Sequence, residues 1–315
     1  MTRRTHSPSL SSSTDQPAAE RSALGPRPFT RREFLAASGA GLGLAAVPRL
    51  ASALSATSVT RVMNSSISPQ PLGVQLYTLR DMVESNFEYA LREVAAVGYK
   101  EVEFAGLFGN DPKKAAKLLS KFGLTAPSSH IGLDRLTAKL PGVVDEAQAL
   151  GNEFVVCPSI EGPPLKSADD WRRVAEQFNR LGDSLQRVGL KFAFHNHDRE
   201  FAPLPSGETG YDILLAECDP RFVKMELDLY WIAKAGRDPL TYFEKYPRRF
   251  PLVHVKDMGA AGAMANVGQG RIDWPKIFAK RRDAGIEHFF VENDNARSPI
   301  DDIRISYAYL SRMDL

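Results

Sequence analysis

The fold is decided by residues 168–198, which read ADDWRRVAEQFNRLGDSLQRVGLKFAFHNHD. Apolar residues recur at helical spacing over 168–188, and Gly189 follows as the residue typical of a helix end. The run 191–195 has the length and apolar character of a buried strand. It leads into the polar residues His195, Asn196, His197 and Asp198. A helix, a turn and a buried strand with a polar end therefore follow one another.

The same alternation of strand and helix occurs eight times after residue 71. The predicted strands cover 72–77, 101–105, 125–130, 153–157, 191–195, 223–228, 252–256 and 288–293. The amphipathic helical runs include 87–97, 112–122, 136–150, 168–188 and 274–284. A doubly wound open sheet would normally carry a glycine-rich phosphate loop after an early strand, and none follows 72–77. Eight β-then-α units predict a single-domain α/β fold, the (β/α)₈ TIM barrel.

The N-terminal part of the chain has a different character. Residues 1–53 hold seven Lys and Arg against three Asp and Glu, whereas the other 262 residues hold 33 against 35. The run 30–35 (TRREFL), a Gly- and Ala-rich segment over 36–47 and a small-residue site at 51–53 resemble a twin-arginine export signal. We expect residues 1–53 to be a disordered tail with this signal, 54–71 a linker, and 72–315 the barrel. The alternative is a disordered basic tail with a chance pair of arginines.

These features also define the expected location and partners. The twin-arginine translocase is the expected partner during export, and the expected location is periplasmic or secreted. The near-neutral charge after residue 53 argues against a nucleic-acid surface. No second apolar stretch has the length of a membrane span, so we expect no stable membrane anchor. The chain is compatible with a homo-oligomer.

Polar residues gather where the predicted strands end. In a parallel barrel these ends meet at one mouth, where active sites form. The main candidates are Tyr77, Glu103, His130, His195, His197, Glu226, Asp228, His254, Lys256 and Glu292. Buried charges are costly unless they are paired or bind a metal, so one divalent ion is predicted there. The mixed nitrogen and oxygen donors suit Mn²⁺, Zn²⁺, Co²⁺ or Fe²⁺ better than Ca²⁺.

Several motifs resemble the xylose isomerase-like sugar phosphate isomerase/epimerase family, in the expected order along the chain. They are Gly73–Arg80 (GVQLYTLR), Phe194–Asp198 (FHNHD), Glu226–Asp228 (ELD), His254–Asp257 (HVKD), Gly268–Trp274 (GQGRIDW) and Val291–Glu292. The resemblance implies one divalent metal held by strands 5 to 8, with Asp228, His254 and Glu292 as ligands. A Glu is usual on strand 5, where this chain offers His195 or His197 instead. A His-rich strand 5 is nearer to inosose dehydratase-like and 3-keto-glycoside-processing proteins.

The resemblance also implies a chemistry, namely proton abstraction next to the carbonyl of a sugar or keto-sugar. We expect Glu292 to bind the metal and act as the base, with His195 or His197 as its partner. Lys256 would neutralise the developing oxyanion or a substrate phosphate, or form an ion pair with Glu226 or Asp228. The carbohydrate would contact Tyr77, Glu103, His130, Glu226 and Trp231, with Tyr77, Phe104 and Trp231 forming an apolar wall.

The main functional prediction is a metal-dependent isomerase or epimerase. The first alternative is a lyase or dehydratase that acts on a keto-sugar, an inosose or a 3-keto-glycoside, since losing a β-hydroxyl group also follows proton abstraction. Two further alternatives are an endonuclease IV-like phosphodiesterase and a non-catalytic sugar-binding barrel that has lost its metal.

Overall fold

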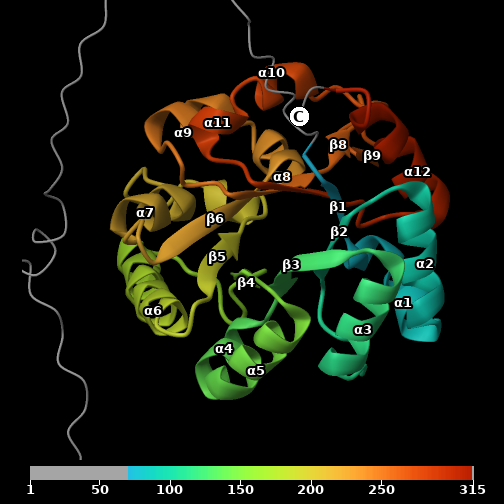
Figure 1. Ribbon diagram of the computed structural model, residues 1–315. Helices are drawn as coiled ribbons and strands as arrows, with labels where there is room; N and C mark the ends of the chain where they lie inside the picture. Colours follow the sequence, from blue (N-terminus) through green and yellow to red (C-terminus); the bar gives the residue numbers. More distant parts are fainter. Residues whose placement is uncertain (1–69, 314–315) are drawn as a thin grey trace, which may run out of the picture. The chain divides into compact units, whose positions relative to one another are not determined.

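The computed structural model describes residues 70–313. Eight parallel strands close into a barrel in the order β1-β10-β7-β6-β5-β4-β3-β2 (Figure 1). The barrel strands are β1 (Leu72–Gln75), β2 (Glu101–Phe104), β3 (Thr125–His130), β4 (Phe154–Cys157), β5 (Lys191–His195), β6 (Val223–Asp228), β7 (Leu252–Val255) and β10 (His288–Val291). The predicted (β/α)₈ barrel is confirmed.

The strands end close to their predicted positions. β3, β5 and β6 match the predicted bounds at both ends, and the other strands are one or two residues shorter. β1 stops at Gln75 because the Gln75 side chain accepts a hydrogen bond from the Tyr77 backbone N–H at 3.1 Å. This contact starts a 3₁₀ turn, η1 (Leu76–Leu79), which turns the chain out of the barrel wall.

Helices surround the barrel (Figure 1). They are α1 (Arg80–Ser85), α2 (Phe87–Val97), α3 (Pro112–Phe122), α4 (Leu133–Ala138), α5 (Leu140–Leu150), α6 (Ala168–Gln186), α7 (Gly210–Glu217), α8 (Leu229–Lys234), α9 (Pro239–Lys245), α10 (Trp274–Phe278), α11 (Arg281–Ala284) and α12 (Pro299–Leu310), with a 3₁₀ turn η2 (Arg199–Phe201). A short antiparallel hairpin, β8 (Asp257–Met258) with β9 (Met264–Ala265), follows β7.

Two predicted helices were wrong as single elements. The run 136–150 is divided into α4 and α5, because Pro141 has no N–H to donate and fits only at the start of a helix. The run 274–284 is divided into α10 and α11 by a turn that no residue pattern signals. Gly123 and Gly151 end α3 and α5 in the left-handed region, at φ +67° and +76°, as predicted.

Alternation along the strands places an apolar layer beneath a polar one inside the barrel. The apolar layer consists of five fully buried side chains from β4, β5, β7 and β10, which are Phe154, Val156, Ala193, Leu252 and Phe290. Side chains two residues further along each strand point to the same face. His195, His254 and Glu292 therefore lie directly above this apolar layer.

The tail and twin-arginine signal predicted over 1–53, and the linker up to residue 69, lie outside the described residues. Within 70–313, no helix has both the length and the apolar character needed to cross a membrane.

Candidate metal centre

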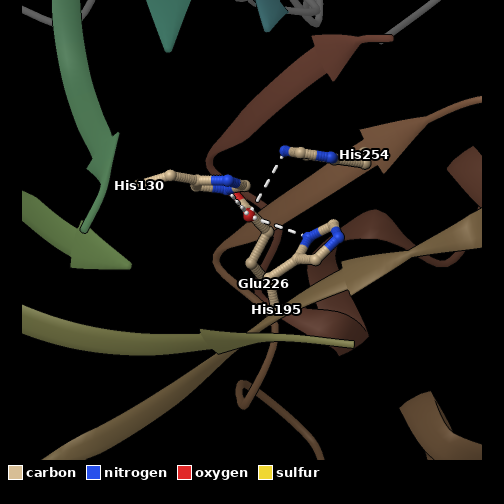
Figure 2. Close-up of side chains that lie close together, drawn as sticks. All are labelled: His130, His195, Glu226 and His254. Carbon is tan, nitrogen blue, oxygen red and sulfur yellow. Dashed lines mark hydrogen bonds and ion pairs between the residues drawn. The ribbon is translucent and has the colours of Figure 1, made fainter. Parts of the chain in front are cut away.

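The deepest polar layer of the barrel is centred on the carboxylate of Glu226 (Figure 2). Glu226 is fully buried on β6. Its Oε2 lies 2.7 Å from His130 Nε2, 3.1 Å from His195 Nδ1 and 3.2 Å from His254 Nε2. The three imidazoles come from β3, β5 and β7. Four strands therefore meet at one carboxylate oxygen.

A second buried carboxylate, Glu103 on β2, supports this layer. Its Oε2 accepts a hydrogen bond from Gln75 Nε2 at 2.8 Å and lies 2.6 Å from His254 Nε2. Glu103 and Glu226 both contact Nε2 of His254, and Glu226 also contacts Nδ1 of His195. The other ring nitrogens, Nδ1 of His254 and Nε2 of His195, face the polar layer above. Carboxylates that hold the far nitrogen of an imidazole commonly orient metal-binding histidines.

The two carboxylates also set the charge of the imidazoles. Burial disfavours a charged His130, but the coulombic attraction of Glu103 and Glu226 outweighs burial and raises its pKa to about 9. Burial likewise opposes the charge of His254, and Glu226 leads the carboxylates that raise its pKa well above the usual range. For His195, burial and then the neighbouring His254 lower the pKa well below the usual range. His195 is therefore neutral, the form in which an imidazole binds a metal.

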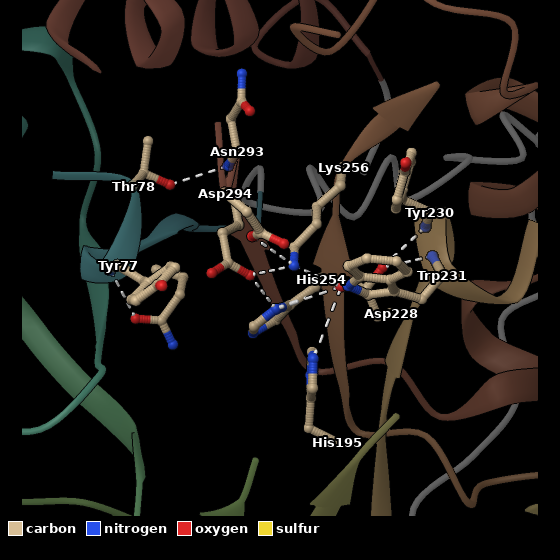
Figure 3. A network of polar contacts seen from close by, with 12 residues as sticks. Tyr77, Thr78, His195, Asp228, Tyr230, Trp231, His254, Lys256, Asn293 and Asp294 are labelled. Atoms are coloured by element: carbon tan, nitrogen blue, oxygen red, sulfur yellow. Dashed lines mark hydrogen bonds and ion pairs between the residues drawn. The ribbon is translucent and has the colours of Figure 1, made fainter. Parts of the chain in front are cut away.

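The layer above brings Asp228, His254 and Glu292 together. Figure 3 shows Asp228 and His254 beside Lys256. One ligand atom from each of these residues lies within 4.8 Å of the other two. Asp228 Oδ2 is 3.8 Å from both His254 Nδ1 and His195 Nε2. Within residues 70–313, the buried atoms Asp228 Oδ2 and His254 Nδ1 make no well-directed hydrogen bond, although Lys256 Nζ lies 2.9 Å from the first and Glu292 Oε2 lies 2.7 Å from the second. A cation would give both of these atoms a well-directed partner.

Lys256 provides the resident positive charge of this layer. Its ammonium is buried and lies 2.9 Å from Asp228, 2.7 Å from Glu292 and 2.9 Å from Asp294. Burial opposes the charge, but these carboxylates raise the pKa of Lys256 well above its usual range. Three carboxylates around one ammonium leave two negative charges, which one divalent ion would offset. The residues present therefore fit a divalent metal, with Asp228, His254, Glu292 and His195 as the groups able to hold it.

A cavity of about 510 Å³ opens above these layers. Its lining includes His130, His197 and Lys256, and Tyr77 stands at its edge with 42% of its surface exposed. His197 Nδ1 is buried and has no hydrogen-bond partner among the described residues. Burial first, and then Lys256, lower the pKa of His197 to about 4. The neutral imidazole ring of His197 therefore lines the space where a substrate would lie.

The structure brings some of the predicted ligands together and places other residues elsewhere. Asp228, His254 and Glu292 lie together with His195, whereas His197 lies one pleat further on, at the cavity. The expectation that Glu103 binds substrate is corrected, because this carboxylate is fully buried in the deep layer and does not line the cavity.

Three further expectations also need correction. Glu226, like Glu103, lies in the deep layer and does not contact the cavity. Phe104 does not contribute to the expected apolar wall at the barrel mouth. It is fully buried against Phe87 behind the strands, with ring centroids 6.1 Å apart. The ion pair expected as an alternative for Lys256, with Glu226 or Asp228, is observed with Asp228 and needs no correction. Trp231 lies beside His197, with ring centroids 5.3 Å apart, and is not among the lining residues.

Asp257 is a residue whose role sequence reasoning missed. Its fully buried carboxylate accepts five hydrogen bonds of 2.8–3.2 Å. The donors are the backbone N–H groups of Met258, Gly268, Gly270 and Ile272, and the indole Nε1 of Trp274. A Cβ on Gly270 would come within 2.1 Å of Asp257 Oδ1, so only glycine fits. The Gly-x-Gly spacing was the available signal, because close backbone approach to a carboxylate requires it.

We predict that Asp257→Asn lowers the free energy of unfolding by about 2–4 kcal/mol, because an amide group would face donors that need an acceptor. Urea unfolding followed by circular dichroism and by tryptophan emission measures this loss. Asp273→Asn is the control, since Asp273 only caps α10 through the Lys276 N–H at 3.1 Å and an Asn side chain caps a helix about as well, so stability should hardly change. Equal effects of the two variants would contradict the role given to Asp257.

The comparison with known families agrees with the geometry. A family model described as "Xylose isomerase-like TIM barrel" matches residues 91–312. The chain belongs to this family. The resemblance carried by the sequence motifs is thereby confirmed at the family level, whereas the comparison does not reach the residues of the expected export signal.

Relatives within and around this xylose isomerase-like family are enzymes. An inosose dehydratase from Lacticaseibacillus casei is 25% identical over 256 residues, which cover 68% of this chain and 85% of that protein. The crystal structure of a sugar phosphate isomerase/epimerase from Parabacteroides distasonis is 27% identical, with a TM-score of 0.66, over 79% of this chain and 96% of that one.

A third similarity concerns the fold alone. The crystal structure of the IOLI protein, which contains a zinc atom, is 15% identical with a TM-score of 0.61, over 77% of this chain and 99% of that one. The relatives as a group support an enzyme of the xylose isomerase-like family, and they favour the dehydratase alternative over the isomerase expected first from the sequence.

Proposed function

We propose that this protein is a metal-dependent lyase that removes water from a keto-sugar or keto-cyclitol. The observation that carries the proposal is the convergence of Asp228, His254 and Glu292 at a cavity that the ring of His197 also lines. Similarity to inosose dehydratases over most of their length supports a lyase acting on a polyhydroxy ketone. The same group of residues suits one transition-metal ion, and zinc in the IOLI structure supports that class of ion.

The bound ion would polarise the carbonyl of the substrate and so acidify the neighbouring C–H. His197 is placed to accept that proton, since its neutral ring lines the cavity. Glu292 is the weaker candidate base, because His254 and Lys256 already hold its Oε2 at 2.7 Å each. This revises the expectation that Glu292 is the base. The Lys256 ammonium would stabilise negative charge on the substrate oxygen while the electron pair moves.

Loss of the hydroxyl group on the next carbon completes the reaction. The electron pair left by the abstracted proton forms the new C=C bond, and the C–O bond to the hydroxyl breaks. The proton carried by His197 can return to the departing oxygen, so that water leaves and the side chain is neutral again. Atoms and charge balance without any further reactant.

The test is incubation of metal-loaded protein with an inosose and with a 3-keto-glycoside in deuterated buffer, followed by NMR and mass spectrometry. We expect a product lighter by one water, with absorbance from the new conjugated ketone. His197→Gln should lower kcat roughly 10²–10⁴-fold with metal content retained. His288→Gln should leave kcat unchanged, because His288 pairs with Glu101 at the opposite end of the barrel, with the Nδ1 and Oε2 atoms 2.9 Å apart.

An epimerase is the second candidate, favoured by the Parabacteroides distasonis structure. It would give a deuterated epimer with no loss of water, and this result would overturn the lyase proposal. Binding without turnover or exchange at any metal loading would point instead to a non-catalytic barrel.

A further inference from the structure

Each permanent cation that lines the cavity is already paired with carboxylates. The Lys256 ammonium contacts three of them, at 2.7–2.9 Å. Arg135 on α4 lines the cavity as well, and its Nη2 lies 2.7 Å from Oε2 of Glu146 on α5. The Arg135 side chain is 40% exposed and the Glu146 side chain 12%, so water screens this ion pair only in part. Each lining cation therefore already has a carboxylate partner before a substrate binds.

The imidazoles of the lining do not supply a free charge either. His130 Nε2 lies 2.7 Å from Glu226 and 3.3 Å from Glu103. His195 lies between Glu226 and Asp228, at 3.1 Å and 3.8 Å. Any positive charge on these rings is therefore offset by carboxylates that lie closer than a substrate could.

The balance of charge around the cavity remains negative when a metal is bound. Six carboxylates surround the site, and the permanent cations are Arg135 and Lys256. The carboxylates are Glu103, Glu146, Asp228, Glu226, Glu292 and Asp294. A divalent ion adds two positive charges and a protonated His130 one more, so one negative charge is still uncompensated when His254 binds the metal as a neutral ring.

Arg80 is a further cation near the mouth. Its guanidinium stacks on the ring of Tyr77 at 4.4 Å and donates to the Tyr77 carbonyl at 3.0 Å. It does not line the cavity. A phosphate inside the cavity would therefore lie out of its direct reach, with Tyr77 between them.

We infer that the site takes an uncharged polyhydroxy ketone and rejects phosphorylated or carboxylated ones. This inference rests on the proposed function, which places the substrate in this cavity. A phosphate group would have to lose its hydration in a site of the same sign of charge. Phosphate sites normally offer arginine or lysine groups free to bind oxygen, and both lining cations here are held by glutamate or aspartate. Hydroxyl groups, by contrast, can donate to the carboxylates and accept from Lys256.

The inference can be tested by calorimetric titration of metal-loaded protein with an inosose and with a phosphate monoester of the same inosose. The neutral ketone should bind, and its phosphate should bind at least about tenfold more weakly. Glu146→Gln removes the partner of Arg135 and keeps the size of the side chain. This variant should bind the phosphorylated ketone roughly tenfold more tightly than the wild type does, with the neutral ketone unchanged.

Glu88→Gln is the matched control, because it frees Lys121 in an exposed pair elsewhere on the barrel, with the two charged atoms 2.6 Å apart. It should leave both affinities unchanged. Equal or tighter wild-type binding of the phosphorylated ketone would overturn the inference, as would a Glu146→Gln variant with no gain for phosphate.

The outcomes for substrate charge and for reaction type are distinguishable. Dehydration of a phosphorylated ketone would overturn the inference and leave the lyase proposal intact. Epimerisation of a neutral ketone, together with rejection of its phosphate, would support the inference and overturn the lyase proposal.

Discussion

Asp228→Asn should leave the purified protein without its divalent ion and lower kcat roughly 10³-fold or more. The substitution keeps the side-chain oxygen that accepts the Tyr230 and Trp231 N–H groups at 2.9 Å, so α8 should still begin at Leu229. It removes the charge beside Lys256 and the buried oxygen aimed between His254 and His195. Loss of the metal removes several kcal/mol of transition-state stabilisation, which corresponds to roughly this rate effect. Elemental analysis and steady-state turnover measure the two effects.

Asp238→Asn is the control for this experiment. Asp238 caps α9 through the Leu240 N–H at 2.9 Å, which is the same local role as that of Asp228, but it does not belong to the polar layers of the barrel. Full metal content and activity are expected for it. An Asp228→Asn enzyme that keeps one equivalent of metal and normal kcat would mean that the metal centre has been placed wrongly.

Lys256→Met should lower the free energy of unfolding of the metal-free protein by about 3–5 kcal/mol, because it leaves three buried carboxylates without their shared cation. For a barrel of this size, the melting temperature should fall by roughly 6–20 °C. Although burial opposes the charge, the carboxylates raise the pKa of Lys256, so its stabilising contribution is complete at neutral pH. That contribution is lost only as the pH rises through this raised pKa, above the usual range of a lysine.

Differential scanning calorimetry of both proteins at pH 7 measures this effect. Lys234→Met is the matched control, because Lys234 is 41% exposed and pairs with Asp198 at 3.0 Å on the surface. Its loss should cost at most about 1 kcal/mol. A Lys256→Met protein that melts like the wild type would show that the three carboxylates do not depend on the ammonium. Turnover should also fall in Lys256→Met even when metal is restored, since the oxyanion loses its cation.

Much of the barrel could be predicted from sequence because its signals are local. Glycine after a helix and a short apolar run reflect backbone geometry and burial within a few residues, as at Gly123 and Gly151. The end of β1 could not be predicted in this way, because it depends on the Gln75 side chain turning back on its own backbone. The division of 136–150 was signalled by Pro141, and the amphipathic pattern across it concealed that signal.

The site was only partly predictable for a different physical reason. Alternation along a strand tells which residues share the barrel interior, so Asp228, His254 and Glu292 could be grouped. This alternation does not show how deep in the barrel each residue lies. The depth decides whether a carboxylate contacts the substrate or orients an imidazole. Glu103 and Glu226 were therefore expected to contact the carbohydrate, whereas they lie below the histidines. The role of Asp257 was not predictable from strand pattern, since its partners come from a loop up to 17 residues away.

The apolar layer formed by Phe154, Val156, Ala193, Leu252 and Phe290 has a kinetic consequence. These side chains are fully buried and close the barrel beneath the polar layers, so molecules can reach the site only from above. Substrate must enter, and dehydrated product and released water must leave, through the same opening. Product that is still bound there excludes the next substrate molecule. The protein should therefore show product inhibition that is competitive with substrate. At high conversion, its turnover rate should be limited by the rate of product release.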